Sequence, residues 1–168
     1  PAKEGGRSRK RGGEGGRGAA AGKPARTGPV HGGFVGLGVG TVATYGKTGD
    51  AFRCYEIDPD VVQHAHDHFT YLSDSAAKIE IVLGDARLSL EREAPQGFDV
   101  LVLDAFSSDA IPVHLLTREA MEIYQRHLKP DGVLALRISN RFFDPRPTGD
   151  RWAEAFGYRR ERVSATSN

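Results

Sequence analysis

From residue 30 onward, short apolar runs alternate with amphipathic or polar segments, as in a sheet whose strands are joined by helices. Most of these runs are nearly continuous in apolar residues, which indicates strands that are buried on both faces of a parallel sheet. The sequence therefore predicts an α/β fold with a doubly wound, mostly parallel sheet. The predicted strands are residues 33–35, 51–57, 78–83, 98–103 and 133–138.

Helix signals fall between these strands. Asp58 and Pro59 form a strong start, because an acid at the N-cap is followed by proline at the first helical position. Val61, Val62 and Ala65 continue this helix with apolar residues at helical spacing. Elsewhere we expect helices at residues 86–93 and 117–128, a loop at 105–112, a turn at 130–132 and one polar helix at 151–162.

Composition divides the chain into three parts. Residues 1–29 carry a net charge of +6 and contain no aromatic residue, so we expect a disordered, basic tail rich in Gly and Arg. Residues 30–140 hold the strand and helix signals and form the predicted α/β domain. Residues 141–168 form a poorly defined C-terminal segment, so the sheet looks incomplete on that side. The chain begins with Pro1, and we expect a processed product or a piece of a longer protein.

Several classes of protein are excluded or disfavoured. The chain has no apolar run of the roughly 18–20 residues that a membrane span needs. One Arg-Gly-Gly and no aromatic side chain in the tail favour a solvated linker over an arm that binds nucleic acid. The single cysteine, Cys54, excludes an intrachain disulfide and a cysteine-built zinc site. His64 and His68 share a helix face without a third ligand. We therefore expect a cytoplasmic protein without a metal or a nucleic-acid partner.

The candidate chemistry lies where the predicted strands end, since ligands of open α/β sheets bind beyond the carboxyl ends of the strands. Gly36, Gly38 and Gly40 follow the first strand and allow the backbone to turn tightly and approach a ligand. Glu56 ends the second strand, where an acid can accept both hydroxyls of a ribose. A solvated strand end is the plainer interpretation of this glutamate.

Two aspartates follow the next two strands. Asp85 can accept a hydrogen bond from an adenine amino group, or it can cap the helix that begins at Ala86. Asp104 follows the most apolar strand, and its carboxylate could bind or deprotonate an amine. A cap or turn residue in the following loop is the alternative interpretation of Asp104.

The spacing of the glycines separates two kinds of nucleotide site. A nicotinamide fingerprint has Gly-x-Gly-x-x-Gly, whereas here the third glycine comes two residues after the second. Gly-x-Gly-x-Gly followed by an acid is more similar to the arrangement of S-adenosylmethionine-type folds.

Several motifs together resemble the spermidine/spermine synthase family, and most closely its bacterial spermidine-synthase-like members. The likeness covers about residues 30–140. It implies a methyltransferase-like Rossmann fold and the transfer of an aminopropyl group from decarboxylated S-adenosylmethionine to a polyamine. The motifs are the glycine loop 36–40, Tyr-Glu-Ile-Asp-Pro at 55–59, Leu-Gly-Asp-Ala at 83–86, the strand and acid at 98–104, and Ser-Ser-Asp at 107–109.

The resemblance also implies roles for the matching residues. Glu56 would hold the ribose, with Ile57 also at the nucleoside, and Asp85 and Ala86 would meet the adenine edge. The glycine loop would lie beneath the nucleoside.

On the amine side of the implied site, Asp104 would be the catalytic acid that orients or deprotonates the attacking amine, and Asp109 would be a second acid near it. The chain departs from the family at Val39, where the glycine loop usually has an aspartate. It also has two extra residues between the two acids. These departures keep open an S-adenosylmethionine-dependent methyltransferase and a non-catalytic nucleoside-binding scaffold. The implied partners are a polyamine substrate and, as a candidate assembly, a second copy of the chain.

Plainer interpretations hold for several other residues. We expect His114 to be a surface histidine and Cys54 to be a small core residue. Tyr55 and Tyr71 would either line the pocket or pack in the core.

Overall fold

The computed structural model describes residues 28–105 and 112–136, together with residues 154, 156, 157 and 159. Within them the chain forms one parallel five-stranded sheet in the order β3-β2-β1-β4-β5. The strands are β1 (His31–Val35), β2 (Ala51–Glu56), β3 (Lys78–Leu83), β4 (Phe98–Leu103) and β5 (Leu128–Leu136). The doubly wound parallel sheet predicted from the apolar runs is therefore confirmed.

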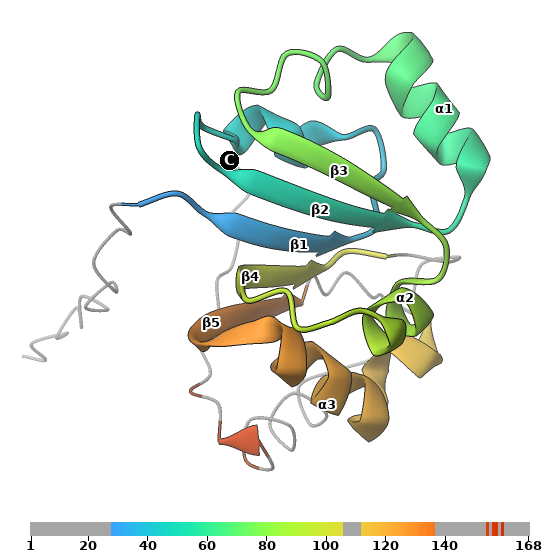
Figure 1. Cartoon of the computed structure of the whole chain (residues 1–168). Helices are drawn as coiled ribbons and strands as arrows, with labels where there is room; N and C mark the ends of the chain where they lie inside the picture. Colours follow the sequence, from blue (N-terminus) through green and yellow to red (C-terminus); the bar gives the residue numbers. More distant parts are fainter. Residues whose placement is uncertain (1–27, 106–111, 137–153, 155, 158, 160–168) are drawn as a thin grey trace, which may run out of the picture.

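Helices connect the strands and cover the sheet (Figure 1). The chain runs outward from β1 to β3 and then returns to place β4 on the other side of β1. The order of the strands thus reverses between β1 and β4, the position where open α/β sheets bind ligands. The helices are η1 (Thr41–Tyr45), α1 (Pro59–His68), α2 (Ala86–Arg92), η2 (Val113–Leu116) and α3 (Arg118–His127).

The helices start at the predicted caps. The side chain of Asp58 accepts the backbone N–H of Asp60 at 2.9 Å, with Pro59 as the first residue of α1. Thr117 caps α3 in the same way, through the N–H of Ala120. In the described part of the chain, no helix is long and apolar enough to cross a membrane.

Two hydrophobic clusters lie on opposite faces of the sheet. In β1, Val35 belongs to the cluster under α2 and α3, while its neighbour Phe34 belongs to the cluster under α1. In β2, Tyr55 belongs to the cluster under α2 and α3, and its neighbour Cys54 belongs to the cluster under α1. Because successive side chains of a strand point to opposite faces, burial of both neighbours shows a sheet covered on both sides.

The fifth strand differs from the prediction, since β5 begins at Leu128 rather than at residue 133. Leu128 pairs with Phe98 and Val133 pairs with Val100, so residues 129–132 form an irregularity within the strand where we expected a turn. The buried carboxylate of Asp99 explains part of this arrangement. Its Oδ1 binds Lys129 Nζ at 2.8 Å, which holds the start of β5 against the sheet.

The amino ends of the strands are also held by buried acids. Asp99 Oδ2 accepts the N–H of His31 at 2.8 Å, and Asp50 Oδ1 accepts the N–H of Val30 at 2.7 Å. These bonds explain why β1 begins two residues before its predicted start. The last part of the predicted fifth strand, residues 137–138, and most of the predicted helix 151–162 lie outside the described residues.

Candidate functional site

The glycine loop leaves the carboxyl end of β1 through backbone conformations that favour glycine. Gly36, Gly38 and Gly40 have φ angles of +97°, +54° and +82°. A Cβ atom on Gly36 would lie 2.8 Å from the carbonyl oxygen of Asp104, so the loop packs directly against the end of β4. A Cβ atom on Gly38 would meet no atom of the described residues within 4 Å. Gly38 therefore presents bare backbone to open space, as a nucleoside cradle requires.

Glu56, the last residue of β2, is a buried clamp rather than a solvated strand end. Its side chain is 9% exposed. Oε2 accepts the N–H of Leu37 in the glycine loop at 2.9 Å, and Oε1 accepts the N–H of Asp58 at 3.1 Å. A carboxylate oxygen can accept more than one hydrogen bond, so both oxygens keep capacity for a ligand hydroxyl.

Asp85 follows β3 and caps α2, which confirms the capping interpretation. Its Oδ1 accepts the N–H of Leu88 at 2.8 Å. Its Oδ2 lies 3.1 Å from Nε2 of His114, whose side chain is 49% exposed. His114 is therefore at the surface, as expected, but it contacts a residue of the candidate site. The side chain of Ala86 is buried in the cluster under α2 and α3.

Asp104 lies at the centre of the carboxyl edge, next to the glycine loop. Its N–H donates to the carbonyl of Val35 at 2.9 Å and so extends the pairing of β4 with β1. Its backbone is the part of β4 that Gly36 contacts. The predicted second acid, Asp109, lies outside the described residues. The structure thus brings the glycine loop, Glu56 and Asp104 together, with Asp85 one strand further out.

Exposed apolar side chains also gather in the segments at this edge. Ile57, which we expected at the nucleoside, is 67% exposed directly after β2. The other exposed apolar side chains in these segments are Val39, Leu83, Leu88 and Val113. Val39 and Leu83 belong to motifs named above, the glycine loop and the Leu-Gly-Asp-Ala motif, whereas no sequence motif pointed to Leu88 or Val113.

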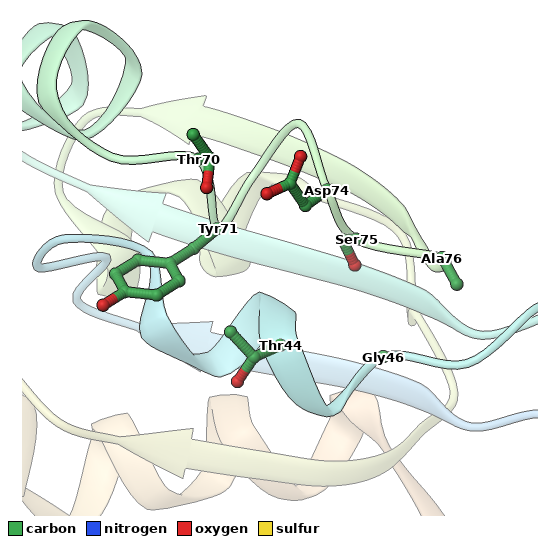
Figure 2. Close-up of a pocket in the computed structure, with 7 residues that line it drawn as sticks. All are labelled: Thr44, Gly46, Thr70, Tyr71, Asp74, Ser75 and Ala76. Carbon is green, nitrogen blue, oxygen red and sulfur yellow. The ribbon is translucent and has the colours of Figure 1, made fainter.

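Two cavities among the described residues lie elsewhere. The first, of about 340 Å³, is formed by η1 and the connection from α1 to β3, and is lined by Thr44, Tyr71 and Asp74 among others (Figure 2). Tyr71 therefore lines a cavity, but not one at the carboxyl edge. The second, of about 330 Å³, lies between α2 and α3. Neither is lined by the acids of the candidate site.

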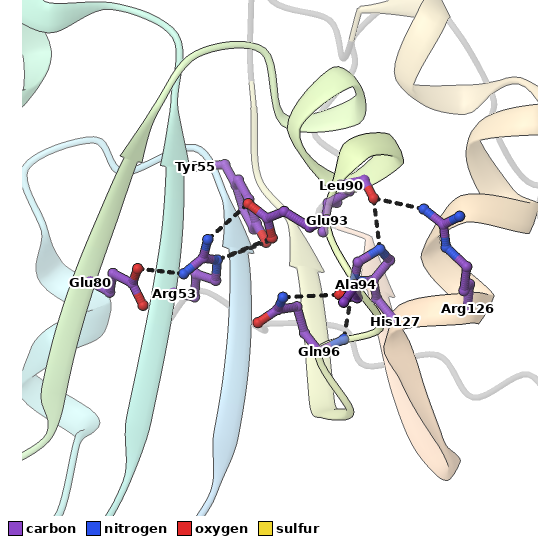
Figure 3. A network of polar contacts seen from close by, with 9 residues as sticks. All are labelled: Arg53, Tyr55, Glu80, Leu90, Glu93, Ala94, Gln96, Arg126 and His127. Atoms are coloured by element: carbon purple, nitrogen blue, oxygen red, sulfur yellow. Dashed lines mark hydrogen bonds and ion pairs between the residues drawn. The ribbon is translucent and has the colours of Figure 1, made fainter.

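Tyr55 is a packing residue in a polar network (Figure 3). Its hydroxyl donates to Glu93 at 2.9 Å, and Arg53 binds both Glu93 and Glu80 at 2.8 Å and 2.5 Å. Burial and the neighbouring Glu93 raise the pKa of Tyr55 well above its ordinary value. Cys54 is fully buried, and burial raises the pKa of its thiol to about 12, which fits the predicted core role.

His127 is a buried residue that the sequence pattern did not reveal. Its Nε2 lies 2.8 Å from the carbonyl of Leu90, and its Nδ1 accepts the N–H of Gln96 at 3.3 Å (Figure 3). A carbonyl can only accept, so Nε2 carries the hydrogen and the ring is the neutral Nε2–H tautomer. Burial lowers the pKa of His127.

On α1, the rings of His64 and His68 lie 4.6 Å apart, and the described residues contain no group of three metal-ligating side chains.

Comparison with known sequences gave no matching family model, but two curated relatives match part of the chain. A polyamine aminopropyltransferase of Vibrio vulnificus is 36% identical over 89 residues, which are 52% of this chain and 28% of that protein. An N-terminal histidine N-methyltransferase of Emericella nidulans is 31% identical over 106 residues, which are 62% of this chain and 19% of that protein. The chain thus spans less than a third of either relative.

Solved structures share the fold. Human methyltransferase-like protein 13 in complex with SAH matches 76% of this chain and 62% of its own, with a TM-score of 0.61 and 23% identity. A probable spermidine synthase from Corynebacterium glutamicum matches 64% of this chain and 39% of its own, with a TM-score of 0.54 and 24% identity. The chain therefore has the Rossmann fold of S-adenosylmethionine-dependent methyltransferases, and over about half of its length its sequence is spermidine-synthase-like.

Proposed function

We propose that this chain carries the nucleoside-binding and reactive part of an aminopropyltransferase, which moves an aminopropyl group from decarboxylated S-adenosylmethionine to a polyamine amine. The observation that carries this proposal is the buried carboxylate of Glu56, bonded to the glycine loop at the carboxyl edge of the sheet. The similarity to the Vibrio vulnificus aminopropyltransferase supports aminopropyl as the group that is transferred.

The residues at the edge fit a sulfonium nucleoside. Gly38 leaves room above its backbone, because a Cβ atom there would meet no described atom within 4 Å. Glu56 supplies acceptors for ribose hydroxyls. Asp85 and Ala86 would meet the adenine edge, and Ile57 offers an exposed apolar side chain to the ring.

The proposed reaction is an in-line displacement at the carbon next to the sulfonium sulfur. The amine nitrogen forms a bond to this carbon, the carbon–sulfur bond breaks, and its electron pair stays on sulfur as the neutral thioether methylthioadenosine leaves. The bound donor supplies the leaving group, so the protein mainly positions the amine and keeps it unprotonated. In this proposal Asp104 takes the proton that the amine must lose.

Charge agrees with a cationic acceptor. Asp104 and the predicted second acid, Asp109, would attract a polyamine, and residues 30–168 carry a net charge of −5. A cytoplasmic location, a homodimer and the absence of a nucleic-acid partner stay predictions.

Methyl transfer from S-adenosylmethionine itself is the second candidate. Val39 is an apolar residue, 39% exposed, where the spermidine synthase family usually has an aspartate in the glycine loop. Without that acid, the loop has less to distinguish an aminopropyl ammonium from a methionine chain. The N-terminal histidine N-methyltransferase, similar over 62% of this chain, also favours this candidate.

A parallel transfer assay distinguishes these functions. The full chain is incubated with a polyamine and either an aminopropyl-labelled decarboxylated donor or methyl-labelled S-adenosylmethionine. We expect label in the polyamine from the first donor only. Label from the second donor alone would establish methyl transfer, and no transfer despite nucleoside binding would contradict aminopropyl transfer to this polyamine.

A further inference from the structure

The contact between Asp85 and His114 joins two segments that are 29 residues apart in the sequence. Asp85 stands between β3 and α2, on the side of the carboxyl edge where the resemblance places adenine. His114 belongs to η2, which follows the connection that leaves β4 after Asp104. Their side chains approach to 3.1 Å between Oδ2 and Nε2.

The backbone next to His114 is held by burial and by hydrogen bonds. The next residue, Leu115, is 3% exposed and belongs to the cluster under α2 and α3. The hydroxyl of Tyr124 in α3 donates to the carbonyl of Leu115 at 3.1 Å, and the N–H of Leu115 donates to the carbonyl of Pro112 at 2.9 Å. The backbone of His114 is thus fixed, while its ring reaches out to Asp85.

The two oxygens of Asp85 have different partners. Oδ1 is committed to the cap of α2 through the N–H of Leu88. A carboxylate can only accept, so His114 donates its Nε2 hydrogen to Oδ2. One oxygen is bonded to the backbone of Leu88 and the other to the ring of His114, and together these two bonds fix the orientation of the Asp85 carboxylate. Oδ2 can still accept a second hydrogen bond, and it is the oxygen left for a ligand.

Stability does not account for this pair. The side chain of His114 is half exposed, and exposed ion pairs add little to folding free energy. We propose that His114 is a positioning residue, which orients Asp85 so that Oδ2 recognises the exocyclic amino group of adenine. This inference rests on the proposed nucleoside site, and it names a determinant of base specificity that both candidate transferases would share.

The consequence is selectivity for adenine over hypoxanthine. An adenine amino group donates to Oδ2, whereas the 6-oxo group of hypoxanthine would place an acceptor against a carboxylate. A site built for one hydrogen-bond donor rejects an analogue that lacks it much more strongly than an apolar pocket would. An Asp85 that has lost His114 would be free to turn Oδ2 away, and the rejection would weaken.

The test compares two ligands on three forms of the full chain. Calorimetry gives the Kd of 5′-methylthioadenosine and of 5′-methylthioinosine for the wild type, His114→Leu and His114→Gln. Leu fills similar space without a donor, and the side-chain amide of Gln can replace the Nε2–H. His66→Leu, on the exposed surface of α1, is the matched control.

We expect the wild type and His66→Leu to prefer the adenine compound, His114→Leu to lose about fivefold or more of that preference, and His114→Gln to recover it. Equal preference in wild type and His114→Leu, with thermal unfolding unchanged, would overturn the role of His114. An equal loss of both ligands in His114→Leu, without rescue by Gln, would also overturn it, since that result indicates a merely structural residue. Failure of the wild type to bind either compound would instead remove the proposed function.

Discussion

The carboxylate of Glu56 accepts the backbone N–H of Leu37 at 2.9 Å, and this bond fixes the glycine loop to the end of β2. The same carboxylate accepts the N–H of Asp58, just before α1. One buried side chain thus holds together the two backbone segments between which a ribose would lie. Both bonds lie within the chain itself, so the shape of the glycine loop is set by Glu56.

Replacing Glu56 with Gln should separate this clamp from simple packing. Gln keeps the shape but can accept through only one oxygen, so its amide nitrogen must face one of the two N–H donors. We expect the free energy of unfolding to fall by about 1–2 kcal/mol and nucleoside affinity to fall roughly tenfold or more. Urea unfolding and calorimetry measure these effects. Glu91→Gln, exposed on α2, is the control and should change neither quantity.

The glycine loop offers a matched pair of alanine substitutions. Gly36→Ala places a Cβ atom 2.8 Å from the carbonyl oxygen of Asp104 at a φ of +97°, so it should cost at least about 3 kcal/mol of stability. Gly38→Ala meets no described atom within 4 Å and should cost only about 1–2 kcal/mol for its φ of +54°. The Gly38 variant should fold and still lose nucleoside affinity. Equal unfolding midpoints for the two variants, or full affinity in Gly38→Ala, would contradict the assignment.

Two histidines, the buried His127 and the half-buried His31, predict a dependence of stability on pH. Burial lowers the pKa of His127 and of His31 in the folded chain, so the unfolded chain binds more protons once the pH falls to about 6.5. Stability should therefore be highest above this pH and decrease as the pH falls below it. Protonation of His127 at Nδ1 would also replace the acceptor of the Gln96 N–H with a donor.

Urea midpoints at pH 7.5 and 5.5 measure this effect in the wild type, His127→Gln and the exposed control His66→Gln. The decrease should be smaller in His127→Gln than in the other two. Asp50 does not interfere, because its bonds to the N–H groups of Val30 and Lys47 lower the pKa of its carboxyl, which titrates at a more acidic pH. The same decrease in all three forms would assign the effect to other groups.

Asp104→Asn tests the proposed proton acceptor. Asn preserves the shape of the side chain but cannot take a proton from an amine, so group transfer should be lost while 5′-methylthioadenosine still binds. A labelled-donor assay and calorimetry on the same preparation give both results. Asp67→Asn, exposed on α1, should keep both properties. Unchanged turnover in Asp104→Asn would remove this residue from the catalytic role.

Much of the fold follows from local signals in the sequence. Continuous apolar runs predict the strands, and Asp58-Pro59 and Thr117 mark helix starts because a side-chain cap and a fixed proline φ act over a few residues. The beginning of β5 is not predictable in this way. Residues 130–132 have the composition of a turn, and the structure places them in an irregularity of β5, between Leu128 and Val133, which both pair with β4. The earlier start of the strand depends on Asp99, which binds Lys129 from 30 residues away.

For the candidate site, too, the sequence predicts the positions of the residues but not their contacts. Strand ends place the glycine loop, Glu56 and Asp104 at one edge, since carboxyl ends of parallel strands meet there. The partners of these acids depend on contacts between distant segments. No local pattern could show that Glu56 is bonded to Leu37, or that His114 would reach Asp85 from a separate element. The burial of His127 is not predictable for the same reason, because it depends on contacts with Leu90 in α2 and Phe98 in β4.

The most direct test of the central claim is a calorimetric titration of the full chain with 5′-methylthioadenosine, the thioether product in the proposed reaction and a ligand that avoids any assumption about the acceptor. We predict a single site in the wild type, an affinity weakened roughly tenfold or more by Glu56→Gln and an affinity unchanged by Glu91→Gln. No heat of binding in a folded wild type, or equal affinity in Glu56→Gln, would contradict a nucleoside site built on Glu56 and the glycine loop.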